Sequence, residues 1–267
     1  MQDNHPNEMA PKAADLIRQQ LDLSLVLRGR VVLIGLGGIG IPLVRTIARF
    51  LAGIGQADAD DASIELLLCD GDAFNHDNLY RMDVPDFGNK AEVLGIALLD
   101  AIDCPNLAIR WIPEYATVEN ISQLIEDGDC VLLACDNHKT RKLVGEHCAH
   151  HMNNVVLISG GNDGLENGLA GTYGNVQVHV RHQGNDVTAP LTRFHPEIAD
   201  PQDHSPADVS CLELAAAGVP QLSFTNLAVA SAMCNALLRL LMPKEQAMYD
   251  EVALDVWEAT SRPHWLT

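Results

Sequence analysis

The stretch that decides the fold covers residues 31–42 and reads VVLIGLGGIGIP. It opens with an aliphatic run at 31–34, the pattern of a strand buried on both faces of a parallel sheet. Four glycines follow: Gly35, Gly37, Gly38 and Gly40. The first, second and fourth of them have the spacing GxGxxG. The segment 41–55 continues as an apolar helix. This unit predicts a phosphate-binding turn, because a helix N-terminus offers N–H donors. Glycines that only allow close packing of helix on strand are the alternative.

Strand patterns and helical patterns alternate after this stretch. Further strands are expected at residues 63–72, 107–115, 130–136 and 155–163. Helices are expected between them at 89–102, 118–127 and 138–151. The alternation predicts an α/β fold with a doubly wound, Rossmann-like and mostly parallel sheet. We assign residues 1–28 to an N-terminal helical arm and residues 29–163 to a nucleotide-binding core.

The pattern changes after this core. Residues 171–182 alternate between polar and apolar side chains, as in an antiparallel strand with one exposed face. A polar loop at 183–210 follows, and loops of that length are usually functional or mobile. A long helix over 222–241 and a terminal strand at 252–257 close the chain. We therefore assign residues 164–267 to the C-terminal half of the same domain as the nucleotide-binding core.

The composition limits the kinds of binding partner and the cellular compartment that we expect for this protein. The 267 residues carry a formal net charge of −19, which repels phosphate backbones and makes nucleic-acid binding by a broad basic face unlikely. The seven cysteines form no CxxC pair, which argues against a disulfide framework and a four-cysteine zinc site. No signal-peptide pattern and no membrane-spanning apolar run are seen. We expect a cytoplasmic protein that does not bind membranes.

An acid and a group of cations follow the second expected strand. Asp70 ends that strand, where a carboxylate can accept hydrogen bonds from ribose hydroxyls, and Asp72 follows it. Asp70 lies 30 residues after Gly40, whereas dinucleotide-binding folds place this acid about 20 residues on. Three further side chains come next: Asn78, Arg81 and Lys90. Such a cluster suits a site that stabilises charge on phosphate, although solvated surface charges are the alternative.

A second acid follows the fourth expected strand, in the segment CDNHKTR at 135–141. An aspartate at the carboxyl end of a parallel strand faces the ligand crevice, and Mg²⁺ is bound through carboxylates and phosphates. Asp136 therefore becomes the candidate Mg²⁺ ligand, with Asn137 beside it. The alternative role for Asp136 is the N-cap of the next helix.

Taken in order, GLGGIG, DGD, DNLYRM, GNK and CDNHKTR resemble the motifs of the ThiF/MoeB family of activating enzymes, which share their fold with ubiquitin-activating enzymes. The resemblance implies ATP and Mg²⁺. It also implies a ubiquitin-like or sulfur-carrier protein whose C-terminal Gly-Gly is adenylated, with thioester formation as a possible later step. The family usually forms homodimers, so a homodimer is expected.

By this resemblance each polar residue receives a role. Asp70 binds the ribose, Asp136 binds Mg²⁺, and three residues contact phosphates: Asn78, Arg81 and Lys90. The glycine turn with Asp72 and Asn137 completes the nucleotide site. The sequence departs from the family pattern at Met82, where relatives have glutamine, and it lacks the N-terminal RYxRQ signature, for which Arg18 is a weak substitute.

Two features of the C-terminal half remain open. Cys211, in the segment SCLELAAAGVPQL, resembles the cysteine with which some relatives form a thioester, and the alternative is a bystander thiol. The loop from His195 to His204 contains histidines and carboxylates, for which a solvated lid is favoured over a metal site. The segments HPEI, PQL and FTN resemble the ThiF-like proteins of the PRTRC gene cluster, which would make the partner protein co-encoded.

Three other functions compete with protein adenylation. A nicotinamide-dependent oxidoreductase fits the glycine turn, but it needs no cations beside the nucleotide. A non-catalytic partner subunit with the same fold would not need Arg81, Lys90 and Asp136 to be intact. Adenylation of a modified tRNA base is disfavoured by the charge of −19.

Overall fold

The computed structural model describes residues 24–27, 29–57, 62–79, 82–165, 170–208, 221–242 and 247–265. Three residues singled out from the sequence lie outside these ranges: Arg18, Arg81 and Cys211. Their roles stay predictions.

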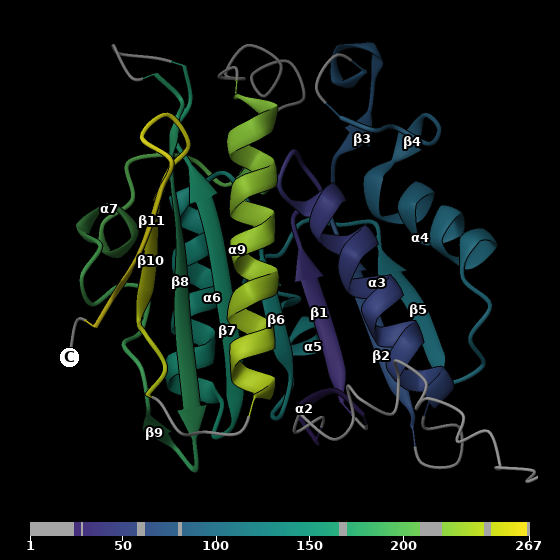
Figure 1. The fold of residues 1–267 in the computed structure, drawn as a ribbon, viewed down its shortest axis with the longest axis horizontal. Helices are drawn as coiled ribbons and strands as arrows, with labels where there is room; N and C mark the ends of the chain where they lie inside the picture. Colours follow the sequence, from purple (N-terminus) through teal and green to yellow (C-terminus); the bar gives the residue numbers. More distant parts are fainter. Residues whose placement is uncertain are drawn as a thin grey trace, which may run out of the picture.

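A nine-stranded mixed sheet forms the centre of the protein (Figure 1). The strand order is β11-β10-β8-β7-β6-β1-β2-β5, and the short β9 pairs with β8. The parallel strands are β1 (Arg30–Ile34), β2 (Ile64–Cys69), β5 (Leu107–Ile112), β6 (Cys130–Leu133) and β7 (Val155–Asn162). The antiparallel strands are β8 (Tyr173–His182), β9 (Asn185–Asp186), β10 (Glu251–Asp255) and β11 (Thr260–His264). The predicted α/β, Rossmann-like and mostly parallel fold is confirmed.

Helices cover both faces of the sheet, so the architecture has three layers (Figure 1). One face carries α3 (Gly40–Ala57), α4 (Lys90–Ala101) and α9 (Ser223–Leu241). The other face carries α5 (Ile121–Leu124), α6 (His138–His151) and α7 (Pro196–Ala199). The remaining short elements are α2 (Ser24–Leu27), η1 (His76–Asn78), η2 (Pro206–Asp208) and the antiparallel pair β3 (Ala73–Phe74) and β4 (Gly88–Asn89). In Figure 1, β3 and β4 lie beyond the end of the sheet toward which β1 points.

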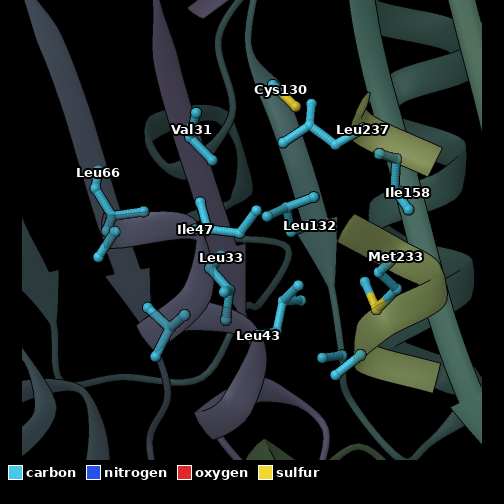
Figure 2. Close-up of a cluster of buried hydrophobic side chains, with 14 of the residues drawn as sticks. Val31, Leu33, Leu43, Ile47, Leu66, Cys130, Leu132, Ile158, Met233 and Leu237 are labelled. Carbon is cyan, nitrogen blue, oxygen red and sulfur yellow. The ribbon is translucent and has the colours of Figure 1, made fainter. Parts of the chain in front are cut away.

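The aliphatic run of β1 supplies both cores, because alternate side chains of a strand point to opposite faces. Val31 and Leu33 belong to the cluster under α3, α4 and α9, and Val32 and Ile34 belong to the cluster under α5 and α6. Figure 2 shows Leu33 among Leu43 and Ile47 of α3 and Leu132 of β6; these four lie in one buried cluster. Burial of β1 on both faces fixes the position of the glycine turn that follows it.

Several expected elements differ in extent. The helix expected at 118–127 is only the four residues of α5, because the Glu126 N–H donates to the Asp129 carboxylate at 2.7 Å instead of extending the helix. The loop expected at 183–210 contains β9 and α7, and β11 was not predicted. Among the described helices, α9 is long and apolar enough to cross a membrane, but half of it is buried, as in a core helix.

Candidate functional site

The carboxyl ends of β2, β1 and β6 lie next to one another, because these strands are neighbours in the sheet. The chain proceeds from β1 outward through β2 and β5, and then returns to the other side of β1 as β6 and β7. Ligands of doubly wound sheets bind in the crevice at such a reversal. The sequence motifs that end these three strands therefore share one edge of the sheet.

The four glycines of the turn have different surroundings. Gly35 has φ +93°, and a Cβ there would lie 2.7 Å from the backbone nitrogen of Cys135. A Cβ on Gly40 would collide with the Gly35 carbonyl, and one on Gly38 would collide with the Asn226 side chain of α9. A Cβ on Gly37 would have no described neighbour within 4 Å. Three glycines thus permit the turn to form, whereas Gly37 leaves open space beside the N-terminus of α3.

Asp70 connects the end of β2 to this turn. Its carboxylate accepts hydrogen bonds from the Leu36 N–H at 2.6 Å and from the Asp72 N–H at 2.8 Å. Burial of the carboxylate outweighs the Lys90 charge and these hydrogen bonds, and it raises the pKa of Asp70 to about 6. A carboxylate has about four acceptor positions, so two remain for a ligand such as a ribose hydroxyl.

Lys90 begins α4, and its side chain is buried. Its Nζ lies 2.9 Å from Oδ2 of Asp72, and Oδ1 of Asp72 accepts a hydrogen bond from the hydroxyl of Tyr115. Burial would raise the pKa of Asp72, but the Lys90 charge and the two side-chain hydrogen bonds outweigh it and lower that pKa. The structure therefore holds a Lys90–Asp72 ion pair beside Asp70.

Asn89 fixes the backbone that carries Lys90. Its side-chain oxygen caps α4 by accepting from the Ala91 N–H at 2.9 Å and the Glu92 N–H at 3.1 Å. Its side-chain nitrogen donates to the carbonyl oxygens of Asp70 and Asp72 at 2.9 and 3.2 Å. A single amide thus joins the end of β2 to the start of α4. Asn89 was not predicted as a site residue, although an asparagine at the start of an expected helix is an N-cap signal.

Asn78 is buried, and its oxygen accepts a hydrogen bond from the Asn75 N–H at 3.0 Å. Its backbone carbonyl accepts a hydrogen bond from the Met82 N–H at 2.9 Å. Among the described residues, Asn78 therefore contacts the backbone on both sides of it, at Asn75 and at Met82. A direct contact of its side chain with phosphate stays a prediction.

At the end of β6 the two adjacent acid and amide side chains have separate roles. Asn137 is buried and caps α6, because its side-chain oxygen accepts from the Thr140 N–H at 2.8 Å. The N-cap alternative for Asp136 is thus wrong. Asp136 is exposed and has no hydrogen-bond or ion-pair partner in the described part of the chain, which leaves its oxygens available for a cation.

Other residues of the same motif are structural. Arg141 is buried and donates to the carbonyl oxygens of Cys135 at 2.8 Å and Gly160 at 2.7 Å, which ties β6 to β7. Burial raises the pKa of the Cys135 thiol to about 11, as expected for a packing residue. The turn and the two acids are therefore held by a buried scaffold rather than by solvent-exposed contacts.

The loop from His195 to His204 lies against this scaffold. The Asp203 carboxylate accepts from the His138 N–H at 2.5 Å and the Lys139 N–H at 3.1 Å at the start of α6, and Lys142 donates to the Ala199 carbonyl at 2.8 Å. No group of three or more His, Cys, Asp or Glu ligands suited to a metal occurs among the residues that the structure describes. The transition-metal alternative for this loop therefore has no support.

An apolar pocket of about 310 Å³ lies next to Gly38 of the glycine turn, between α3 and α9. Its walls include Gly38, Pro42, Arg45, Met82 and Leu227. It shares only Gly38 with the predicted nucleotide site, so it does not represent the crevice between β1, β2 and β6.

Residues 13–262 match the model of the ThiF family. The SAMP-activating enzyme E1 of Haloferax volcanii is 27% identical over 126 residues, which cover 46% of this chain and 42% of that enzyme. The adenylyltransferase and sulfurtransferase MOCS3 of Danio rerio is 31% identical over 120 residues, which cover 44% of this chain and 24% of that protein.

Solved structures agree on the fold. The crystal structure of E. coli MccB with ATP matches with a TM-score of 0.62 at 16% identity, over 94% of this chain and 66% of that one. The chain thus spans less than half of either curated relative and about two thirds of MccB. The family match, in contrast, extends from residue 13 to residue 262 and so takes in the glycine turn and both acids, and the chain belongs to the ThiF family.

Proposed function

We propose that the protein uses ATP and Mg²⁺ to adenylate the C-terminal Gly-Gly of a ubiquitin-like or sulfur-carrier protein. The observation that carries this proposal is the meeting of three features at one sheet edge in a ThiF-family chain: the open space at Gly37, the buried Lys90, and the exposed Asp136. Names of similar proteins support it, since they include an activating enzyme, an adenylyltransferase and a protein crystallised with ATP.

The chemistry needs few covalent contributions from the protein. A carboxylate oxygen of the carrier attacks the α-phosphorus of ATP, the bond from that phosphorus to the bridging oxygen breaks, and pyrophosphate leaves with the bond's electron pair. The products are an acyl-adenylate and pyrophosphate. Positioning and charge stabilisation dominate such reactions. The turn at Gly37 would admit the phosphates, Asp70 would accept from the ribose, and Lys90 would stabilise charge on the leaving phosphates.

The residues at the end of β6 fit Mg²⁺. This ion prefers oxygen ligands and is usually bound through one or two carboxylates and substrate phosphates. Asp136 supplies such a carboxylate, and Asn137 already performs the capping that would otherwise occupy it. When bound, Mg²⁺ neutralises charge on the triphosphate. Arg81 as a phosphate contact, the homodimer and a co-encoded partner remain part of the proposal.

The test is pyrophosphate exchange into ATP in the presence of a carrier protein ending in Gly-Gly. We expect carrier-dependent exchange, with a loss of about 10²–10³ in rate for Lys90→Ala and Asp136→Ala, by analogy with the removal of an oxyanion-hole donor. Asp100→Ala is the matched control, because Asp100 is an exposed carboxylate on α4.

The same assay separates the two chemical steps. Cys211→Ala is expected to retain exchange, since a thioester forms only after the adenylate. Full exchange by Asp136→Ala would contradict its assignment as the Mg²⁺ ligand. Absence of exchange by the wild-type protein with every Gly-Gly carrier, together with exchange on a different substrate, would contradict the proposed substrate class.

A further inference from the structure

Tyr115 lies in the segment after β5 and contacts the same acid that pairs with Lys90. Its hydroxyl donates to Oδ1 of Asp72, while Nζ of Lys90 contacts Oδ2 at 2.9 Å. Its ring covers the residue between the two acids, since a Cβ on Gly71 would lie 2.6 Å from the ring. None of the sequence motifs includes this tyrosine.

Hydrogen bonds from its own loop and from the end of β2 hold the backbone at Tyr115. The Asn120 side-chain nitrogen donates to the Tyr115 carbonyl at 2.9 Å, and the Asn120 side-chain oxygen accepts from the Thr117 N–H at 2.8 Å. The Cys69 thiol at the end of β2 donates to the Glu114 carbonyl at 3.2 Å. The phenol therefore reaches Asp72 from a fixed backbone.

This arrangement divides the two oxygens of Asp72 between two donors. Within the described residues, Asp72 is the ion-pair partner of Lys90, and an ammonium group has three N–H donors. A carboxylate that turned both oxygens toward Lys90 would engage more of these donors and compete more strongly with an anionic ligand. The hydroxyl of Tyr115 holds one oxygen away.

We infer that Tyr115 is a positioning residue, which acts through Asp72 to keep N–H donors of Lys90 directed to the phosphates of a nucleoside triphosphate. This inference rests on the proposed role of Lys90 as a phosphate contact. The inference gives Tyr115 no direct contact with substrate or with the reacting atoms. Its effect passes along a chain of three side chains, from Tyr115 to Asp72 to Lys90.

Tyr115→Phe tests the inference, because it removes the hydroxyl and keeps the ring on Gly71. In carrier-dependent pyrophosphate exchange the KM for ATP should rise roughly threefold to tenfold, the range of one ordinary hydrogen bond, because the lost bond reaches Lys90 only through Asp72; kcat should change less than about twofold. The Kd for ATP–Mg²⁺, measured by calorimetry, should rise by the same factor. Tyr173→Phe, at a half-exposed tyrosine on β8, is the control and should change neither value.

A double-mutant cycle separates positioning from packing. In an Asp72→Asn background, Tyr115→Phe should change the KM and the Kd by less than about 1.5-fold, because the intermediate carboxylate is gone. An unchanged KM in the single variant, or an equal effect in both backgrounds, would overturn the inference. If the wild-type protein binds ATP–Mg²⁺ but shows no exchange, the proposed reaction fails while the Kd still decides the role of Tyr115. If it binds no ATP–Mg²⁺, both fail.

Discussion

Gly37 is the glycine of the turn at which a substitution should weaken ligand binding without destabilising the fold. A methyl group there meets no described atom within 4 Å, whereas methyl groups on Gly35, Gly38 and Gly40 would collide with backbone or with Asn226. Gly37→Ala should therefore keep the free energy of unfolding within about 0.5 kcal/mol of the wild type. The same methyl group should weaken ATP binding about tenfold or more, because it enters the space that a phosphate would occupy.

Urea unfolding and calorimetry test this expectation on matched glycine variants. Gly53→Ala, on the exposed face of α3 with open space around it, should bind ATP normally and gain up to about 1 kcal/mol in stability. Gly40→Ala should unfold or lose several kcal/mol. Normal ATP affinity in Gly37→Ala would show that no phosphate approaches this turn.

Asp70 links the stability of the fold to pH. Its folded-state pKa of about 6 lies above the ordinary value of 3.8, so its contribution is most favourable below pH 3.8 and is lost as pH rises through 6. Between pH 5 and 7.5 this group should lower the free energy of unfolding by about 1 kcal/mol. Asp70→Asn should remove that part of the pH dependence, as measured by urea unfolding of both proteins. Parallel pH curves for the two would contradict the raised pKa.

At the scale of a single element, two polar residues with different roles precede α6: Asp136 and the N-cap Asn137. Asn137→Ala should cost about 1 kcal/mol in unfolding free energy, because the cap on the Thr140 N–H is lost. Asp136→Ala should leave the unfolding free energy within about 0.5 kcal/mol, because its exposed carboxylate has no partner among the described side chains. Thermal and urea unfolding measure both changes. A larger loss in Asp136→Ala than in Asn137→Ala would reverse the assignment.

The segment around α7 is attached to the sheet through His195. Its Nδ1 lies 2.9 Å from Glu197, and its Nε2 lies 3.5 Å from Glu251 of β10. Interactions with Glu251 and then Glu197 raise the pKa of His195 against the opposing effect of burial. This stabilisation is fully present below the unfolded pKa of 6.5 and is lost as pH rises through the folded value.

Amide hydrogen exchange across α7, corrected for the intrinsic pH effect, should therefore be slower at pH 6 than at pH 8. His195→Gln should abolish the difference between the two pH values, because glutamine carries no titratable charge. An unchanged difference in this variant would assign the attachment to other contacts, such as the bond from Lys142 to the Ala199 carbonyl.

At the scale of the whole molecule, the sequence predicted the sheet because its central strands are continuous aliphatic runs with glycine and acid at their ends. The family predicted from five motifs in order is confirmed. The strand β11 escaped prediction because it is short and exposed, with four of its five residues at the surface and a proline among them. The helix at 118–127 was overestimated because the hydrogen bond from the Glu126 N–H to the Asp129 carboxylate is a local turn contact, which apolar periodicity does not encode.

The residues of the candidate site were predicted less completely than the sheet. Residues that end strands or begin helices, such as Asp70, Asp136 and Lys90, could be placed because parallel strands end at one edge. Tyr115 and Asn226 were not predicted as site residues. Tyr115 ends the strand expected at 107–115, but no motif includes it, and its contact with Asp72 is visible only in the structure. Asn226 reaches the glycine turn from α9, far along the chain. The division of roles between Asp136 and Asn137 also needed coordinates, because both residue types cap helices well.

The central claim is that this sheet edge binds a nucleoside triphosphate, and calorimetric titration with ATP–Mg²⁺ tests it most directly. We expect saturable heat with one site per chain, which Lys90→Ala and Gly37→Ala strongly weaken and Asp100→Ala leaves unchanged. Absence of binding heat, or equal affinity in all four proteins, would contradict a nucleotide site at the glycine turn.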